Sequence, residues 1–395
     1  MHFYLTFCQK MDILYVYKWG NMAKNCVTVV EIGSSKLSCV VAQRGVNGIF
    51  NIKANASVEY AGFFEGEFLE KSLLEDSFKS LFAKVASVYQ KNINKIYVGV
   101  PAEFSKVCEI SQQISFRMKK TIKEKDLDAL SEMASDKIDV EDMEVLSVSP
   151  ICYGIDDNRK TNNPIGLKAT KLMADFSAVL AQSSFIQTLN KIWTRLGIEQ
   201  VEYISEPLCE ALTVVDKEER ERTCIVIDVG ARSSSVAFVK GNGLTSLTSF
   251  SMGGSFITSD LAEACSIGYE DARNLKKQIV LSLKGGDNDF YELPLLGGRI
   301  IRIPLNYANE AVCYRLELIA KTVNECIRLF AKEYVPYYPV FLCGAGISKI
   351  KGGKDFFAKC IGRNIAYGTS SIPALDKPEI ASLMGMVEIA LSKNE

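Results

Sequence analysis

Short runs of β-branched and aliphatic residues recur along this chain between longer amphipathic segments, a pattern that is typical of an α/β protein. Two of these runs match each other. Residues 26–41 read CVTVVEIGSSKLSCVV, and residues 223–239 read TCIVIDVGARSSSVAFV. Each predicts a strand that ends in an acid, one apolar residue and a glycine, followed by a small polar turn and a second strand. Because the two hairpins match, they predict two related domains that face each other across a cleft.

The two turns carry the chemistry of a phosphate site. A glycine has no Cβ, so the backbone at Gly33 and Gly230 can approach an anion closely, and successive N–H groups form a positively polarised nest. Further donors are the side chains of Ser34, Ser35, Lys36, Ser233 and Ser234. The acids at the strand ends, Glu31 and Asp228, can hold Mg²⁺ through water, because this ion dehydrates reluctantly. A single turn of this kind also occurs in plain hairpins, whereas the matched pair predicts phosphate binding.

Three further segments extend this plan. Residues 337–346, YYPVFLCGAG, predict a strand that runs into glycines, where an adenine or ribose could lie against the backbone; a turn that merely needs positive φ explains them equally. Residues 198–212 predict a strand that enters a helix with Pro207 in its first turn. Residues 251–264 place Gly253 and Gly254 before a helix whose N-terminus can face an anion. Both helices also fit ordinary capping, so their order along the chain is the stronger observation.

Composition narrows the range of functions. The 395 residues contain 46 Lys plus Arg and 47 Asp plus Glu, a formal net charge of -1, so no overall basic field indicates nucleic acid. The single histidine is His2, close to the terminus, which argues against catalytic triads and HExxH zinc sites. The hydrophobic fraction of 48% is that of a folded protein.

Cysteine usage predicts a reducing compartment. The 12 cysteines are scattered singly without a CxxC pair, and several lie in apolar strand-like runs. We expect them to be reduced and mostly buried in a cytoplasmic protein, without a thiolate metal site. No apolar run approaches the roughly 20 residues that cross a bilayer.

Residues 1–21 are rich in aromatic residues and lack a signal-peptide cleavage site. The preferred interpretation is that translation starts at Met22 and that residues 1–21 are an extension outside the fold. A peripheral membrane anchor is the alternative, because Phe3, Phe7, Met11 and Leu14 approximate one helical stripe. A strand or arm packed on the body is the third.

The order of these segments resembles that of the actin, hexokinase and seventy-kilodalton chaperone superfamily. Within it, the chain most resembles the bacterial cell-division FtsA family, over about residues 27–391. GFFEG at 62–66 is similar to the GxxxG segment of that family, and IYVGV at 96–100 is similar to its VYVGI strand. NPIG at 163–166, with LMADFSAVLA at 172–181, resembles the end of the small subdomain that FtsA proteins insert.

The resemblance implies two ribonuclease-H-like lobes around a nucleotide cleft, with an FtsA-type insertion. The implied boundaries are residues 22–102 with 183–205 for the first lobe, 103–182 for the insertion, and 206–391 for the second lobe with a small subdomain at about 245–312. It also implies binding of ATP with Mg²⁺ and self-association into filaments. The implied partners are FtsZ and other division proteins, and nucleic acid is not among them. The implied location is the inner face of the bacterial cell membrane at the division site.

Site residues follow from the same resemblance. The implied phosphate-binding residues are Gly33, Ser34, Ser35, Lys36, Gly230, Ala231, Arg232, Ser233, Ser234, Gly253 and Gly254. The implied adenosine-side residues are Glu270, Lys276, Gly344, Ala345 and Gly346. Asp228 and Glu31 are the implied acids on the Mg²⁺ side.

The chain also departs from the family pattern. Glu31 stands where the family has Asp, and Ala345 stands where a third glycine is usual. The second turn, normally glycine-rich, contains Arg232, which either binds phosphate in a bidentate manner or fills space that the backbone needs. We therefore expect weak ATP hydrolysis or none.

The C-terminal segment lacks another family feature. FtsA proteins typically end in a linker and a basic amphipathic helix that binds lipid, whereas residues 379–391 contain no Lys or Arg. We expect this segment to be the buried last helix of the second lobe. Membrane contact would then be indirect or would use the N-terminal segment.

Two other functions stay open at this point. An adaptor similar to the actin-like pilus protein PilM, serving an envelope assembly machine, would share the GA-x-S second turn and an insertion. A small-molecule kinase of the same superfamily would need a carboxylate base, and Glu206 is the candidate.

Overall fold

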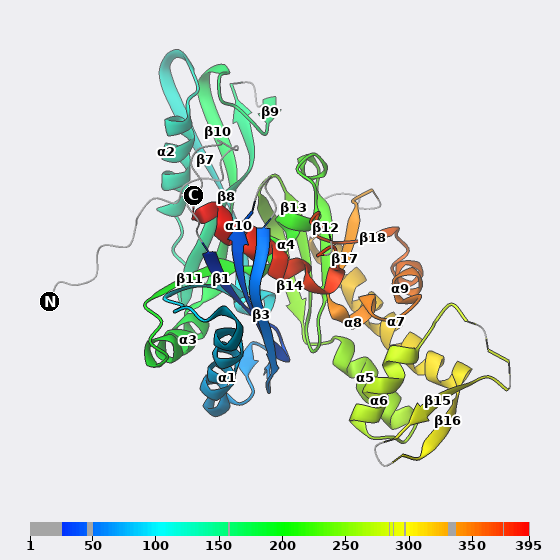
Figure 1. Ribbon diagram of the computed structural model, residues 1–395. Coiled ribbons are helices and arrows are strands. Elements are labelled where there is room, and N and C mark those ends of the chain that lie inside the picture. The colour runs from blue at the N-terminus through cyan, green and yellow to red at the C-terminus, as the bar shows by residue number, and fades with distance from the viewer. Residues whose placement is uncertain are drawn as a thin grey trace.

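The computed structural model describes residues 26–45, 50–156, 159–283, 285–286, 288–295, 298–330, 337–373 and 375–394. The N-terminal extension, the alternative start at Met22 and the candidate anchor residues lie outside the described residues. Figure 1 shows four parts: the first sheet with α1 and α3 at the lower left, and a sheet with α2 above it. The second sheet lies to the right of centre, and a small helical part with β15 and β16 lies at the lower right.

The first lobe is a five-stranded sheet in the order β11-β6-β1-β2-β3. Its strands are β1 (Cys26–Ile32), β2 (Lys36–Arg44), β3 (Phe50–Glu59), β6 (Lys95–Val100) and β11 (Gln200–Ser205). β1 forms an antiparallel hairpin with β2 and pairs in parallel with β6. Helices α1 (Lys71–Tyr89) and α3 (Ser183–Arg195) pack on this sheet. Phe78 of α1 and Trp193 of α3 are part of the apolar core that they form with it. Two short strands, β4 (Phe63–Phe64) and β5 (Glu67–Phe68), precede α1.

The second lobe repeats this plan with a sheet in the order β14-β13-β12-β17-β18. Its strands are β12 (Cys224–Val229), β13 (Ser234–Lys240), β14 (Gly243–Phe250), β17 (Val340–Cys343) and β18 (Ile365–Tyr367). β12 is antiparallel to β13 and parallel to β17, as β1 is to β2 and β6. This correspondence confirms the two related α/β domains that the matching hairpins predicted, in the duplicated arrangement that the resemblance implied.

Helices and one small hairpin surround the second sheet. They are α5 (Gly254–Ala264), α6 (Tyr269–Gln278), β15 (Phe290–Pro294), β16 (Ile300–Pro304), α7 (Leu305–Phe330), α8 (Ala345–Ser348) and α9 (Gly353–Ile361). Buried positions of α7 recur every three or four residues, among them Val312, Leu316, Ile319 and Val323. This spacing places them on one face of the helix, toward the core of the second lobe.

The insertion is a four-stranded sheet in the order β7-β10-β8-β9. The strands are β7 (Ser105–Thr121), β8 (Met143–Ile155), β9 (Arg159–Thr161) and β10 (Lys168–Gln182), and α2 (Glu124–Ser135) packs on the sheet through Leu127 and Leu130. The chain leaves the first lobe after β6 through a short 3-10 turn (Ala102–Phe104) and returns to it at α3. The insertion is therefore a separate layer attached at one place in the sequence.

The last helix, α10 (Ala381–Lys393), corrects one prediction. Its residues are buried as expected. Ala381 at its start joins a core of the second sheet, but most of its buried residues pack elsewhere. Met386, Val387 and Ala390 join the apolar core that Val29 and Val40 form on the first sheet. α10 also contacts α4 (Glu206–Val214), the helix that follows β11. The segment lacks basic residues because nearly every side of it is covered by protein.

Two further properties of the described residues bear on the sequence-based expectations. The cysteines that the structure describes are all free, and each is buried or half-buried. None of the helices in the described ranges has the length and apolar composition needed to span a bilayer.

Candidate functional site

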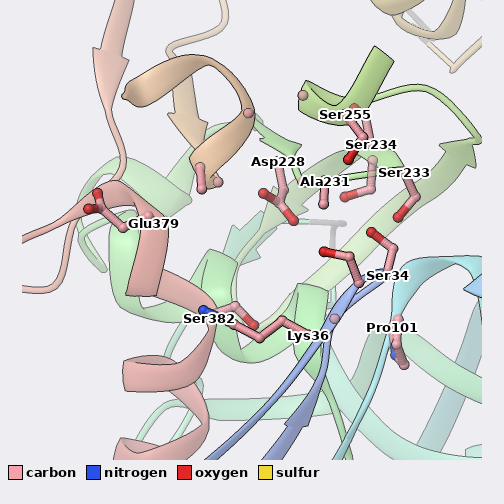
Figure 2. A pocket seen from close by; sticks show the side chains of 18 of the residues that line it. Ser34, Lys36, Pro101, Asp228, Ala231, Ser233, Ser234, Ser255, Glu379 and Ser382 are labelled. Atoms are coloured by element: carbon pink, nitrogen blue, oxygen red, sulfur yellow. The ribbon is translucent and has the colours of Figure 1, made fainter. Parts of the chain in front are cut away.

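A cavity of about 720 Å³ lies between the two lobes. Figure 2 shows Ser34 and Lys36 on one side of it and Asp228, Ser233 and Ser234 on the other. All but two of the predicted site residues line it: Glu31, Gly33, Ser34, Ser35, Lys36, Asp228, Gly230, Ala231, Ser233, Ser234, Gly254, Glu270, Lys276, Gly344, Ala345 and Gly346. The exceptions are Arg232 and Gly253. The fold thus brings together residues that are spread over most of the sequence.

The first turn, residues 33–36, is closed by its own backbone. The N–H of Gly33 donates to the carbonyl of Lys36 at 3.0 Å. The hydroxyl of Tyr60 donates to the carbonyl of Gly33 at 2.9 Å. Burial, followed by the charge of Glu206, raises the pKa of Tyr60, so its hydroxyl keeps the proton that it donates. The turn is held rigidly at the cavity wall.

The second turn, residues 230–234, has the same closure. The N–H of Gly230 donates to the carbonyl of Ser233 at 3.0 Å. The hydroxyl of Ser234 donates to the carbonyl of Met252 at 2.6 Å, which fixes the turn to the segment before α5. The two turns face each other because each joins a matching pair of strands.

Gly253 has a packing role instead of a place in the cavity wall. The N–H groups of Gly254 and Ser255 donate to the carbonyls of Gly230 and Ala231 at 2.9 and 2.7 Å. A Cβ on Gly253 would lie 2.7 Å from both of these carbonyl oxygens. The glycine therefore lets the start of α5 dock on the second turn. These two amides of the helix N-terminus are already hydrogen-bonded, so they are not free donors for an anion.

Arg232 also departs from both alternatives that the sequence left open. Its guanidinium donates to the carbonyl of Ala61 in the first lobe and does not line the cavity. Its backbone N–H donates to the hydroxyl of Ser34 at 3.0 Å. Gly62, the residue after Ala61, approaches the first turn closely: at φ +84°, a Cβ there would lie 1.9 Å from the carbonyl oxygen of Ser34 and 3.1 Å from Arg232 Nη1. Arg232 thus ties the two lobes together at the edge of the two turns.

Four carboxyl groups gather at the cavity: Glu31, Glu206, Glu210 and Asp228. Burial is the largest cause that raises the pKa of each of them, and the charges of neighbouring acids add to it in Glu206, Glu210 and Asp228. The pKa of Asp228 rises to about 7, with Glu31 as the second cause. Lys36 opposes the shift at Glu31. A cation would relieve the repulsion within this group.

This donor set fits Mg²⁺ held through water. Across the described part of the chain, no three His, Cys, Asp or Glu side chains converge closely enough to ligate a metal directly. Mg²⁺ commonly keeps several waters and uses one or two carboxylates together with phosphate oxygens. Asp228 and Glu31, at the ends of β12 and β1, are the residues that would hold such an ion.

Sequence reasoning did not find Glu210 and found Glu206 only as a kinase base. Both lie on α4, four residues apart, so they share one face of the helix. Glu206 Oε1 accepts the N–H of Ile32, at the end of β1, at 3.2 Å. The i, i+4 spacing of two acids in an otherwise apolar helix was the available signal.

The predicted adenosine side is formed by close contacts among glycines. Gly344 has φ +81°, and a Cβ there would lie 2.1 Å from Asp228 Oδ1 and 2.3 Å from the carbonyl of Val229. A Cβ on Gly346 would lie 2.6 Å from the carbonyl of Gly230, and one on Gly254 would lie 2.7 Å from the Cα of Gly346. These glycines are required because the ends of β12 and β17 and the start of α5 meet here.

An ion pair crosses the mouth of the cavity. Arg273 of α6 contacts Glu59 of β3, with Nη2 and Oε1 separated by 2.5 Å, and both residues line the cavity. Nothing in the sequence pairs these two residues, because they are more than 200 residues apart.

Lys276, which lines the cavity, makes a testable contribution to the pH dependence of stability. Its ammonium group donates to the carbonyl of Gly254 at 2.6 Å. Burial is the main cause that lowers the pKa of Lys276 to about 8, and Arg273 and Lys349 add to it. In the unfolded chain a lysine titrates near its usual value of about 10.4. Between roughly pH 8 and 10 the unfolded chain therefore binds more protons, and the free energy of unfolding rises with pH.

We expect the substitution Lys276→Met to remove about 1 kcal/mol of that rise, because Lys276 is only half-buried and water screens part of the effect. Urea unfolding at pH 8 and pH 9.5 measures it. The control is Lys277→Met, which changes the exposed neighbour. If the free energy of unfolding depended on pH in the same way in both variants, the lowered pKa would not belong to Lys276.

Comparison with known proteins relates this geometry to a family. Residues 225–385 match the family model described as "Cell division protein FtsA". Residues 105–180, which form most of the inserted sheet, match the model described as "SHS2 domain inserted in FTSA".

Curated relatives agree with these matches. FtsA of Staphylococcus epidermidis strain RP62A is 21% identical over 378 residues, which cover 95% of this chain and 81% of the relative. FtsA of Escherichia coli K12 is 22% identical over 282 residues, which cover 70% of this chain and 66% of the relative.

Solved structures show the fold. The chain is similar to a protein of the "PilM-PilN type IV pilus biogenesis complex", with a TM-score of 0.61, 16% identity, and coverage of 93% of this chain and 99% of that chain. It is also similar to MreB 5 of Spiroplasma citri bound to AMPPNP, with a TM-score of 0.56, 12% identity, and coverage of 94% and 98%. The likeness to the pilus protein is one of structure alone, so it does not carry the PilM-like alternative. With its duplicated actin-like lobes and its inserted sheet, the chain belongs to the FtsA family of cell-division proteins as a divergent member.

Proposed function

We propose that this chain binds ATP with Mg²⁺ between its lobes and acts as a division scaffold that self-associates and links FtsZ filaments to the division apparatus. It would work at the inner face of the bacterial cell membrane, with weak or no ATP hydrolysis. The family assignment supports the role in division. The observation that carries nucleotide binding is the convergence of two matching glycine turns on one cavity.

The phosphates would lie between the two turns. The proposed donors are the backbone N–H groups of Ser34, Ser35, Ala231 and Ser233, the hydroxyls of Ser35 and Ser233, and the ammonium of Lys36. Bound Mg²⁺ would supply charge neutralisation beside Asp228 and Glu31. The adenosine would lie against Gly344 to Gly346, with Glu270 and Lys276 at its side. The similar fold of MreB 5, which was solved bound to AMPPNP, supports this use of the cavity.

Weak hydrolysis follows from the state of the acids. Burial and the charge of Glu31 raise the pKa of Glu206. The higher the pKa of a carboxyl group, the smaller is its ionised fraction, which alone can accept a proton from an attacking water. Glu206 also accepts the N–H of Ile32, which directs one of its oxygens to the backbone. The same argument weighs against Glu206 as the base of a kinase.

The proposed division of the chain follows the sheets. Residues 22–102 and 183–205 would form the first lobe, 103–182 the insertion, and 206–391 the second lobe with its small subdomain at about 245–312. Two helices depart from this division, because α10 and part of α4 pack on the first sheet. The lobes are therefore joined by these helices as well as by the chain connections.

Calorimetry tests nucleotide binding directly. A chain that starts at Met22 is titrated with ATP, with and without Mg²⁺, beside Asp228→Ala. We expect a dissociation constant on the order of micromolar with Mg²⁺, and at least about tenfold weaker binding by the variant, because the acid next to the ion is lost. A cooperatively melting protein that binds no ATP would contradict the proposal and leave a scaffold without a nucleotide.

The division role needs a separate test. The purified chain is sedimented with FtsZ filaments and, alone, at increasing concentration. Co-sedimentation with FtsZ and self-association are expected. If pull-down from the native cell instead recovered mainly pilus proteins, the PilM-like role would replace the one proposed here.

A further inference from the structure

The insertion belongs to the first lobe by its chain connections but also packs on the second lobe. It leaves and re-enters the first lobe, yet β7, β8 and β10 all contact β14, the edge strand of the second sheet. Val179 of β10 belongs to an apolar core that it shares with residues of α4, the second sheet and the start of α10, and Val107 and Leu146 pack against it. The insertion thus bridges the lobes. If one lobe rotates against the other, the insertion must either move with the second lobe or lose its contact with β14.

The contact is made by a backbone turn that only glycines allow. The turn between β13 and β14 consists of Gly241 and Asn242, and Gly243 begins β14. Gly241 has φ +59°, and a Cβ there would lie 2.1 Å from the carbonyl oxygen of Ile151 in β8. The N–H of Asn242 donates to the carbonyl of Pro150 at 3.0 Å. A Cβ on Gly243 would lie 2.5 Å from the Cβ of Ser177 in β10.

Arg220 is hydrogen-bonded to this turn. Its side chain is 8% exposed. Its Nε donates to the carbonyl of Gly241 at 2.9 Å, and the N–H of Gly241 donates back to the carbonyl of Arg220 at 2.7 Å. Its Nη1 donates to the carbonyl of Leu212 at 2.9 Å and also contacts the carbonyl of Val215. A buried guanidinium is tolerated here because these carbonyls satisfy it.

The acceptors on the other side of Arg220 lie at the C-terminal end of α4. Leu212 is in the last turn of this helix and Val215 is its C-cap residue, where free carbonyls carry partial negative charge. The N-terminal end of the same helix carries Glu206, which lines the cavity and accepts the N–H of Ile32. One short helix therefore reaches from the cavity to Arg220, and Arg220 reaches the turn that seats the insertion.

We propose that Arg220 is the joint that ties helix α4 and the second lobe to the inserted subdomain, so that changes in the cavity are passed on to the insertion. The joint itself follows from the contacts above. The transmission rests on the nucleotide binding proposed for the cavity, and the experiment separates the two.

Hydrogen exchange of the whole chain, read by mass spectrometry, tests the joint without nucleotide. The variant is Arg220→Met, and the matched control is Arg222→Met, which changes an exposed arginine two residues away. We expect peptides over residues 240–243 and 143–155 to exchange at least about tenfold faster in R220M, because the turn loses the buried guanidinium that donates to its carbonyl. R222M is expected to match the unchanged chain. Equal rates in all three proteins would overturn the joint.

A conservative variant covers the case in which R220M does not fold. Arg220→Lys keeps the charge but lacks the planar fork that reaches several carbonyls. We expect R220K to fold and to show faster exchange in the same two segments. Exchange at the unchanged rate in R220K, with R220M unfolded, would count against a joint that depends on the guanidinium.

Addition of ATP with Mg²⁺ tests the transmission. In the unchanged chain, residues 33–36 and 230–235 and the two insertion-side segments are all expected to exchange more slowly. In R220M, only the cavity segments should respond. An insertion that responds equally in R220M would overturn the transmission. Cavity segments of the unchanged chain that do not respond would overturn nucleotide binding, while the nucleotide-free comparison still decides the joint.

Discussion

Replacing Gly344 by alanine is expected to lower the free energy of unfolding by about 3 kcal/mol or more. Gly344 has φ +81°, a region that costs an alanine roughly 1–2 kcal/mol. The new Cβ would also lie 2.1 Å from Asp228 Oδ1 and 2.3 Å from the carbonyl of Val229. Because these atoms belong to the end of β12, which is fixed in the second sheet, they must shift. Urea unfolding followed by circular dichroism gives the value.

Gly362→Ala is the matched control for this experiment. Gly362 has φ +74°, but no atom lies within 4 Å of a Cβ built there. Its cost is expected to be the backbone term alone, about 1 kcal/mol. The difference between the two variants measures how closely Asp228 approaches the glycine turn. If both cost the same, the crowding at Gly344 would be refuted.

Asp228→Asn is expected to have opposite effects on the free and the ligand-bound protein. In the free chain, burial and the charge of Glu31 raise the pKa of Asp228 to about 7. An unfolded aspartate titrates near 3.9, so between about pH 4 and pH 7 the folded chain holds more protons. The stabilising contribution of the protonated acid is complete at low pH and is lost as the pH rises through 7.

At pH 8 the ionised Asp228 therefore destabilises the folded chain, and asparagine removes that charge. The full shift corresponds to roughly 4 kcal/mol. Because Asp228 is half-buried at the cavity wall, we expect D228N to raise the free energy of unfolding by about 2 kcal/mol at pH 8. Below about pH 4, where the acid is protonated in both states, the variant and the unchanged chain should be equally stable.

With ATP and Mg²⁺ present the order should reverse. Ligand at about a hundredfold its dissociation constant stabilises a folded protein by roughly 2.7 kcal/mol. The unchanged chain should gain this amount, whereas D228N should gain little, because asparagine does not offer the charge that Mg²⁺ needs.

Glu388→Gln is the control for the response to ATP. This residue is half-buried outside the cavity, where its carboxyl group accepts the hydroxyl of Thr213 at 2.8 Å. E388Q should keep the full response to ATP. A D228N protein that also kept the full response would show that Asp228 is not beside the ion.

Much of the site could be predicted from sequence because its parts are local. The strand, acid and glycine of each hairpin are contiguous, so Gly33 with Glu31 and Gly230 with Asp228 could be recognised from spacing alone. Each turn is closed by a hydrogen bond within four residues. Their matching pattern then predicted that the two turns would meet, and the cavity contains both.

The sequence did not predict which surface covers which. The burial of residues 381–391 followed from their apolar composition, but the packing of most of this helix on the first sheet did not. Arg232 was expected to bind phosphate or to crowd the turn; in the structure its guanidinium donates to the carbonyl of Ala61. Gly253 was expected at the cavity and instead permits the docking of α5.

The sequence by itself determined the elements of this protein, the duplicated hairpins and the chemistry of the two turns, because periodicity and turn residues act over a few positions. Only the tertiary structure decided the pairing of Arg273 with Glu59, the grouping of four acids at one cavity, and the seating of the insertion on the second lobe through Arg220. These contacts join residues from separate segments of the chain. Their geometry depends on how whole sheets pack, which no local pattern specifies.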